Sequence, residues 1–333
     1  MTEDLVSSPE SWGLLAGFDA GQTHSRCRLA SWNGRTIAEG QGPGVSHLAA
    51  AGGAERFQAA LSLSLADARL QLPAPWAEAP LQAAAVGASG IEQGSAVQAQ
   101  AQALAAAALG LQLAQLAVSG DERTALRGAF PQGPGIVVIS GTGTIAVGRD
   151  GEGREHRCAG WGWLLDGAGS AMDIGRDGLA LSLQMADGRR ADTPLRAALW
   201  QALAVEPDDP QAAQRIKALV VQPDFGPAGF ARLAPVVAAL ASHGNPEAQA
   251  ILRLNGQALA ASVAGVARAL GLTTPPVAAL GGAITHLEGL RQSFRDALQQ
   301  ELPGATLQEP LGDACQGALA MARECSGGSS ANA

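Results

Sequence analysis

Two glycine- and threonine-rich turns, each set between apolar runs of strand-like residues, constrain the fold of this chain more than any other feature. The first lies in residues 17–25 and the second in residues 137–145, about 120 residues further along. Glycine lets the backbone turn tightly and approach a ligand closely. The threonine hydroxyls and free backbone N–H groups of such turns can point at phosphate oxygens. The pair therefore predicts two related α/β domains that close over a nucleotide.

Composition agrees with two domains and argues against nucleic acid as a partner. At 333 residues, of which 47% are hydrophobic, the chain is long enough for two domains of roughly 150 residues each. The formal net charge is −8 and the sequence has no basic stripe, so we expect no nucleic-acid partner. Bound ATP would need a local cradle of hydrogen-bond donors, together with Mg²⁺, to offset this negative charge.

The sequence predicts neither a signal peptide nor a membrane span. Residues 1–9 are polar and acidic and lack the basic and apolar regions of a signal peptide. We find no uninterrupted apolar run approaching the ~20 residues that cross a membrane. The four cysteines are scattered without a CxxC pair, which argues against a zinc or iron–sulfur site. We therefore expect a cytoplasmic protein with no membrane partner.

The predicted strands and helices follow a similar order in the first and the second part of the chain. In the first part, we expect strands over residues 14–19, 26–32, 36–39, 81–87 and 113–118, and helices over residues 48–70, 94–109 and 122–128. The second part predicts strands over residues 135–140, 145–148 and 277–280, a mainly helical stretch over residues 170–269, and helices over residues 285–302 and 313–323. The pairs Asn33-Gly34 and Asp150-Gly151 predict hairpin turns.

This repeat predicts two domains, over residues 12–125 and 126–325, with a boundary near residues 123–134. The last helix, about residues 313–323, could pack back on the N-terminal domain. The small polar residues 326–333 are expected to form a disordered tail.

Five motifs in this order resemble the superfamily of sugar kinases, Hsp70 and actin ATPases. They are DxGxTxS from Asp19, Asp121 after a strand, SGTGT from Ser140, GWG from Gly160 and LGG from Leu280. The closest resemblance is to the N-acetylglucosamine kinases, which are grouped with the BadF/BadG/BcrA/BcrD ATPases, and it runs from about residue 14 to residue 322. It implies two ribonuclease H-like (actin-like ATPase) domains, with ATP and Mg²⁺ in an interdomain cleft. Members of the family are often homodimers.

For the nucleotide, the resemblance implies a carboxylate and two phosphate loops. Asp19 would hold hydrated Mg²⁺, a hard cation that prefers oxygen ligands, and Gly21 and Thr23 would reach the phosphates. The second phosphate loop and the adenosine motif would comprise Gly141, Thr142, Gly143, Thr144, Gly281 and Gly282. The simpler alternatives are an aspartate that caps local N–H groups, a plain hairpin turn and a helix-entry turn.

The resemblance also implies an acceptor site. Asp121 would be the base that accepts the proton of a sugar hydroxyl as this hydroxyl attacks the γ-phosphate, although aspartate is also a favoured helix N-cap. The sugar would contact Ser46, Gly160, Trp161 and Asp166. The second tryptophan of this region, Trp163, is expected in the core.

Two motifs depart from the family pattern, and both lie on the sugar side. Relatives carry Gly-Asp-Glu-Gly-Ser after the GWG turn, whereas this chain has Gly167 and Ala168 at the Asp and Glu positions and an aspartate, Asp166, one place earlier. Ser46 stands where relatives carry asparagine. The ATP motifs are intact, so the identity of the acceptor sugar is the open question.

The leading hypothesis is ATP-dependent phosphorylation of an amino sugar, N-acetylglucosamine to its 6-phosphate first and glucosamine next. One alternative is a dehydratase-activating ATPase, which would need a second cysteine close to Cys158 to hold an iron–sulfur cluster. Another is a non-catalytic sugar sensor on a kinase scaffold, suggested by Gly167 and Ala168. The five histidines have no metal-ligand spacing and are expected mostly at the surface or in loops, and Arg28 is expected to face solvent.

Overall fold

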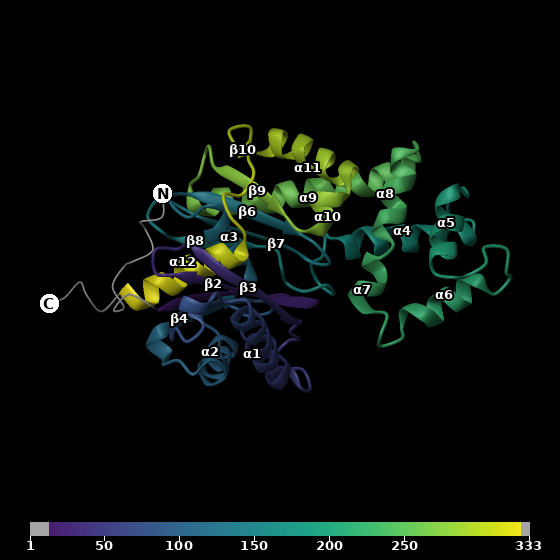
Figure 1. Cartoon of the computed structure of the whole chain (residues 1–333). Helices are drawn as coiled ribbons and strands as arrows, with labels where there is room; N and C mark the ends of the chain where they lie inside the picture. The colour runs from purple at the N-terminus through teal and green to yellow at the C-terminus, as the bar shows by residue number, and fades with distance from the viewer. Residues whose placement is uncertain (1–12, 328–333) are drawn as a thin grey trace. The chain divides into compact units, whose positions relative to one another are not determined.

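The computed structural model describes residues 13–327. These residues divide into two compact units: unit 1 combines residues 13–132 with residues 310–327, and unit 2 comprises residues 133–309. Each unit is an α/β structure built on a five-stranded sheet (Figure 1).

The sheet of unit 1 has the strand order β3-β2-β1-β4-β5. Its strands are β1 (Leu14–Ala20), β2 (His24–Ser31), β3 (Thr36–Pro43), β4 (Leu81–Ala88) and β5 (Leu116–Gly120). The first three strands are antiparallel neighbours, whereas β4 runs parallel to β1 and β5 runs parallel to β4. The hairpin predicted at Asn33-Gly34 joins β2 and β3, and Gly34 has the positive φ of 87° that such turns need.

Helices cover both faces of this sheet. They are α1 (Gly53–Leu70), α2 (Ala96–Leu109), α3 (Asp121–Ala129) and α12 (Ala314–Gly327). Successive side chains of a strand point to opposite faces: Leu14 and Phe18 of β1 join the core that includes α1 and α2, and Leu15 packs with Leu319 of α12. The sequence of β1 is therefore apolar at almost every position, as in other strands covered on both faces.

The sheet of unit 2 repeats the topology of unit 1. Its strands are β6 (Gly135–Ser140), β7 (Thr144–Arg149), β8 (Glu155–Cys158), β9 (Pro276–Leu280) and β10 (Thr306–Leu307). The order β10-β9-β6-β7-β8 is that of unit 1 read from the other edge, with antiparallel β6-β7-β8 and parallel β6-β9-β10. The predicted α/β fold with two ribonuclease H-like halves is confirmed.

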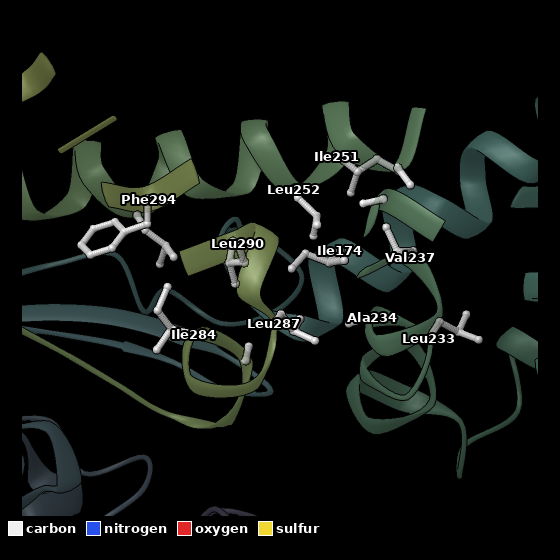
Figure 2. Close-up of a cluster of buried hydrophobic side chains, with 14 of the residues drawn as sticks. Ile174, Leu233, Ala234, Val237, Ile251, Leu252, Ile284, Leu287, Leu290 and Phe294 are labelled. Atoms are coloured by element: carbon white, nitrogen blue, oxygen red, sulfur yellow. The ribbon is translucent and has the colours of Figure 1, made fainter. Parts of the chain in front are cut away.

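Helices dominate the rest of unit 2, as predicted. They are α4 (Ala171–Ala186), α5 (Pro194–Ala202), α6 (Ala212–Val220), α7 (Gly226–Ala231), α8 (Ala234–Ser242), α9 (Pro246–Leu270), α10 (Gly282–His286) and α11 (Glu288–Glu301). Figure 2 shows how the apolar side chains of several helices meet in one core, with Ile174 of α4, Val237 of α8 and Leu252 of α9 near Leu287 and Leu290.

By length and composition, α9 is the one helix in the described part of the chain that could cross a membrane, with a mean hydropathy of 1.2 over its most apolar window. No such segment is predicted from the apolar runs of the sequence. In the structure, 56% of that window is buried, and α9 packs against α11 and the sheet strands of unit 2. Its apolar composition is thus explained by its place in the core of unit 2.

Some element boundaries differ from prediction for local reasons. Helix α1 begins at Gly53 instead of near residue 48, because residues 47–52 form turns and Gly52 adopts a φ of 71°. The segment Leu113–Gln115 is a short 3-10 helix, so β5 starts at Leu116.

Other differences concern whole elements. The helix predicted over residues 285–302 is two helices, α10 and α11, separated at Leu287. Strands β8 and β10 were not predicted. The residues Ser326 and Gly327 of the predicted tail belong to α12, and residues 328–333 lie outside the described residues, as do residues 1–12.

Candidate functional site

The carboxyl ends of β1, β4 and β5 meet at one edge of the unit 1 sheet. Asp19 of β1 pairs with Gly87 of β4, which pairs with Ser119 of β5. Asp121 follows two residues later, as the first residue of α3. Ligands of open α/β sheets bind outside the carboxyl ends of the strands. The structure therefore brings Asp19 and Asp121, both predicted from the sequence, to the same edge.

The surroundings of Asp121 suit a proton acceptor that works near neutral pH. Burial raises the pKa of the Asp121 carboxyl to about 7, and the negative charges of Glu122 and Asp19 add to this rise. The N–H groups of Asp121 and Glu122 donate to the carboxylate and oppose the rise only in part. The alternative interpretation as an N-cap does not hold, because Gly120 occupies the N-cap of α3. A general base is most effective when its pKa lies near the working pH.

Asp19 is held by an arginine from the neighbouring strand. Its side chain is 24% exposed, and its Oδ2 accepts a hydrogen bond from Nη2 of Arg26 at 2.8 Å. The antiparallel register of β1 and β2 places these two residues opposite each other. Arg26 also donates from Nη1 to Asp313, just before α12, at 3.1 Å. Neither Arg26 nor Asp313 was predicted as a site residue, although the register of the β1–β2 hairpin could have indicated Arg26.

The prediction that Arg28 faces solvent was wrong. Its side chain is only 15% exposed, and it donates to both carboxylate oxygens of Asp313, at 2.7 and 2.9 Å, and to Glu39 at 2.6 Å. The physical reason is that α12, which is remote in sequence, packs against this face of the sheet and brings Asp313 to it.

The first glycine-threonine turn connects β1 to β2. The N–H of Gly21 donates to the carbonyl of His24 at 3.1 Å, and the carbonyl of Gly21 accepts from the N–H of Val45 at 2.9 Å. Thr23 is exposed in this turn, and Ser46 follows Val45. The Oγ atom of Ser46 is buried and has no hydrogen-bond partner among the described residues. Unit 1 thus places Ser46, with this unsatisfied hydroxyl, beside the turn.

The second turn connects β6 to β7 in unit 2. Thr142 is exposed, whereas Thr144 is buried and its Oγ1 has no hydrogen-bond partner within residues 13–327. Neither Gly141 nor Gly143 has a positive φ, and a Cβ added at either would meet nothing within 4 Å. The protein itself therefore gives no steric reason for glycine here. The open space and the free hydroxyl fit a ligand that approaches the backbone closely.

The predicted adenosine motif lies next to this turn. Strand β9 is parallel to β6, so Gly281 and Gly282 follow it at the same sheet edge as Ser140 and Gly141. Gly281 has a φ of 99°, and a Cβ on it would lie 2.5 Å from the Ser140 carbonyl oxygen. Glycine is required at this position for both reasons. It is also the N-cap of α10, so the helix-entry interpretation is confirmed, while a role in binding stays a prediction.

The predicted sugar-binding turn follows β8. Gly160 and Gly162 have φ values of 77° and 91°, which favour glycine. Between them Trp161 is 63% exposed, and the guanidinium of Arg157 lies 4.8 Å from its ring centroid. The prediction that Trp163 is in the core was wrong: it is 41% exposed, because the chain leaves the sheet after β8 and runs along the surface.

Asp166 lies in the same loop, where its N–H donates to the carbonyl of Gly162 at 2.8 Å. The next residue, Gly167, is buried, and a Cβ there would lie 2.6 Å from Cε of Met172 and 3.2 Å from Oδ1 of Asp173. Asp173 is only 4% exposed and forms an ion pair with Arg176. A buried carboxylate of α4 thus lies beside the position where relatives carry aspartate.

A pocket of about 580 Å³ lies between α8, α9 and α11 of unit 2. Its apolar lining includes Ala238, Ala239 and Leu252, and its polar lining includes Gln249, His286 and Gln292. His286 is the last residue of α10, the helix that begins at Gly282. At 1.5 Å per residue, this short helix spans roughly 7 Å, so the pocket and the second phosphate loop flank the same helix.

Within residues 13–327, no group of three or more His, Cys, Asp or Glu side chains could hold a metal ion. All five histidines are exposed, in agreement with the prediction. Mg²⁺ would therefore need nucleotide phosphates and water beside Asp19, which is its usual mode of binding. The carboxylate of Asp19, with its Oδ1 in no hydrogen bond of the described chain, fits such a role.

The repeated sheet order and the loops at its edges define an α/β protein with the fold of the actin-like ATPases. Residues 16–322 match the BadF/BadG/BcrA/BcrD ATPase family. The chain belongs to this family, as its motifs predict.

Individual relatives agree with this assignment. The chain is 29% identical over 216 residues to the N-acetylmuramic acid/N-acetylglucosamine kinase of Clostridium acetobutylicum, an alignment that covers 64% of this chain and 69% of the relative. It is 30% identical over 199 residues to the N-acetyl-D-glucosamine kinase of Dictyostelium discoideum, an alignment that covers 56% of this chain and 59% of the relative. The crystal structure of a candidate N-acetylglucosamine kinase from Chromobacterium violaceum is 33% identical, with a TM-score of 0.73 over 94% of this chain and 99% of that one.

Proposed function

We propose that this protein is an ATP-dependent sugar kinase that phosphorylates N-acetylglucosamine at its 6-hydroxyl. Membership of an ATPase family and relatives that are named sugar kinases support the class of reaction. The observation that carries the proposal is Asp121, a carboxylate whose pKa is raised to about 7 at the same sheet edge as Asp19.

In this reaction, Asp121 accepts the proton of the acceptor hydroxyl as its oxygen bonds to the γ-phosphorus of ATP. The bond between the γ-phosphorus and the bridging oxygen breaks, and ADP leaves. Phosphoryl transfer depends mainly on alignment and on neutralising charge. A base that is half ionised near neutral pH can accept the proton and later release it to solvent.

The glycine-threonine turns are suited to the phosphates of ATP. Thr23, in the turn that Gly21 shapes, and Thr142 and Thr144 would contact them. The free Oγ1 of Thr144 and the open space at Gly143 support this assignment. Mg²⁺, when bound, neutralises phosphate charge, and Asp19 would hold it through coordinated water.

The adenosine end of ATP would follow α10 from Gly281 and Gly282 toward the pocket between α8, α9 and α11. The volume of about 580 Å³ is sufficient for a purine. The amide side chains of Gln249 and Gln292 offer donors and acceptors to the base, and Ala238 and Leu252 offer an apolar wall.

The acceptor sugar would contact Ser46, Gly160, Trp161 and Asp166. The exposed ring of Trp161 can cover the apolar face of a sugar or an acetamido methyl. Positive φ values at Gly160 and Gly162 shape the backbone of this turn. Glucosamine is the next candidate acceptor. N-acetylmuramic acid is a further candidate, because the name of the Clostridium acetobutylicum relative includes it.

The two other hypotheses predict different results. A dehydratase-activating ATPase would need cysteines for an iron–sulfur cluster, but Cys158 is the one cysteine in unit 2. A non-catalytic sensor is consistent with Gly167 and Ala168 but leaves the raised pKa of Asp121 without a role. We place the kinase in the cytoplasm, where ATP is available and cysteines stay reduced.

The test is phosphosugar formation from ATP with N-acetylglucosamine, glucosamine, N-acetylmannosamine, N-acetylmuramic acid and glucose, followed by ³¹P NMR to identify the phosphorylated hydroxyl. Asp121→Asn is the critical variant, and Asp224→Asn, at an exposed position remote in sequence from the motifs, is the matched control. Sugar-dependent turnover that is lost only in Asp121→Asn supports the proposal. Wild-type protein that binds ATP yet phosphorylates no sugar contradicts it and favours the sensor.

A further inference from the structure

Asp19 belongs to a network of four charged side chains. The network extends to Asp313, the residue before helix α12. Arg26 donates from Nη2 to Asp19 and from Nη1 to Oδ2 of Asp313, at 2.8 and 3.1 Å. Arg28 donates to both oxygens of Asp313, at 2.7 and 2.9 Å. All four residues belong to unit 1, and the side chains are between 15% and 36% exposed. The network joins residues that are almost 300 positions apart in the sequence.

This network leaves the two oxygens of Asp19 in different states. Oδ2 is bonded to Arg26, whereas Oδ1 takes part in no hydrogen bond or ion pair of the described chain. The guanidinium at 2.8 Å from Oδ2 also leaves no room for a metal ion that binds both oxygens at once. A carboxylate in this state offers one oxygen, in one orientation.

Arg26 is itself fixed by two carboxylates. The planar guanidinium donates through two separate nitrogens, a geometry that the compact ammonium of lysine does not reproduce. A guanidinium does not lose its proton in proteins, so these bonds join opposite charges. Asp313 therefore restrains the same guanidinium that holds Asp19.

We propose that Arg26, anchored by Asp313, is a positioning residue that turns Oδ1 of Asp19 toward the hydrated metal ion of the bound nucleotide. The inference rests on the proposed function, because it assigns Asp19 to the metal. It adds that the beginning of the C-terminal helix is part of the metal-binding arrangement. Residues that orient a metal-binding side chain commonly change metal affinity by roughly 10–100-fold when they are lost.

The first measurement is metal binding without sugar and without turnover. Free Mn²⁺, used in place of Mg²⁺, is titrated by electron paramagnetic resonance against full-length protein with saturating ADP. We expect Arg26→Gln to weaken Mn²⁺ binding roughly tenfold or more, and Arg26→Lys to restore only part of the loss. ADP binding in the presence of EDTA should change less than about twofold, because Arg26 acts on the metal and not on the nucleotide.

Asp313→Asn tests the anchor without removing the local helix start. The Oδ1 of Asp313 accepts from the N–H of Gln316 at 2.9 Å, and asparagine caps helices as well as aspartate does. This variant loses the anchoring charge, so we expect Mn²⁺ affinity between those of wild type and Arg26→Gln. The matched control is Arg127→Gln, which removes another arginine ion pair to α12, with Glu324, away from Asp19.

The outcomes separate the two proposals. Unchanged or tighter Mn²⁺ binding in Arg26→Gln overturns the positioning role, as does an equal loss in Arg127→Gln. An equal loss of ADP binding with and without metal also overturns it, since Arg26 would then act directly on the nucleotide or on the fold. If wild-type protein binds Mn²⁺ with ADP but phosphorylates no sugar, the kinase proposal fails while the role of Arg26 is still decided by its variants.

Discussion

Replacing Asp121 with asparagine should remove activity and, at neutral pH, increase stability. The substitution keeps the size of the side chain but removes the proton acceptor. Loss of a general base typically lowers kcat by roughly 10²–10⁴-fold. In the wild type, the pKa of Asp121 is about 7, so kcat/KM should fall about tenfold for each pH unit below that value.

The stability change follows from the direction of the same shift. Folding raises the pKa of Asp121 from 3.8 to about 7, so the folded protein binds this proton more tightly than the unfolded chain does. The contribution of Asp121 to the free energy of unfolding is therefore fully present below the lower value and is lost as pH rises through about 7. Three pKa units correspond to about 4 kcal/mol as an upper limit. For a half-buried carboxyl among other acids, we expect about 2 kcal/mol.

Urea unfolding at pH 5 and pH 8 measures this effect. Asparagine does not ionise, so Asp121→Asn should exceed wild type by about 2 kcal/mol at pH 8 and by clearly less at pH 5. Asp224→Asn serves as the control at both pH values. Turnover retained in Asp121→Asn, or a variant less stable than wild type at pH 8, would refute the assignment of a base with a raised pKa.

Further substitutions separate binding from folding. Gly143→Ala should leave the melting temperature unchanged, because an added Cβ meets nothing within 4 Å, but should raise KM for ATP. Gly281→Ala should destabilise unit 2 by more than about 1 kcal/mol, since φ is 99° and the Ser140 backbone is in the way; unchanged urea unfolding would contradict this. Trp161→Ala should raise KM for the sugar and leave KM for ATP unaffected. Ala239→Trp should fill part of the pocket and weaken binding of ADP, measured by calorimetry; unchanged affinity would place the base elsewhere.

Strands and hairpins were predictable wherever the local sequence determines them. The apolar runs of β1, β4 and β6 and the turn at Asn33-Gly34 lie where the sequence predicts them. Strand β8 was missed because Glu155–Cys158 carries polar residues at a sheet edge, where one side faces solvent and little apolar periodicity remains. The break between α10 and α11 was not predicted because it falls at Leu287, and leucine does not indicate the end of a helix as proline or glycine does.

The candidate site shows the same division between local and distant information. Asp19 and Asp121 were found because each follows a buried strand that ends at the same sheet edge. Asp313 was not found, since its role depends on the packing of α12 against β1 and β4. The prediction for Arg28 was wrong for the same reason. The alternation of side chains along β2 indicates the face of the sheet on which Arg28 lies, but not the helix that covers this face.

The acceptor side of the site departs from the family pattern at Gly167, yet a carboxylate, Asp166, still stands in the same loop. At Gly167, an added Cβ would lie 2.6 Å from Cε of Met172, which is the end of a flexible side chain, and 3.2 Å from Oδ1 of Asp173, so an aspartate there would face a second carboxylate. Asp173, which lies beside Gly167, is buried and paired with Arg176, and so is not available to a sugar. That leaves Asp166, which is fixed in the loop of Trp161 by its bond to Gly162. If Asp166 holds the sugar, Asp166→Asn should raise KM for the sugar while ADP binding and the pH profile set by Asp121 stay as in wild type. An unchanged sugar KM would mean that the acceptor is recognised without a carboxylate from this loop.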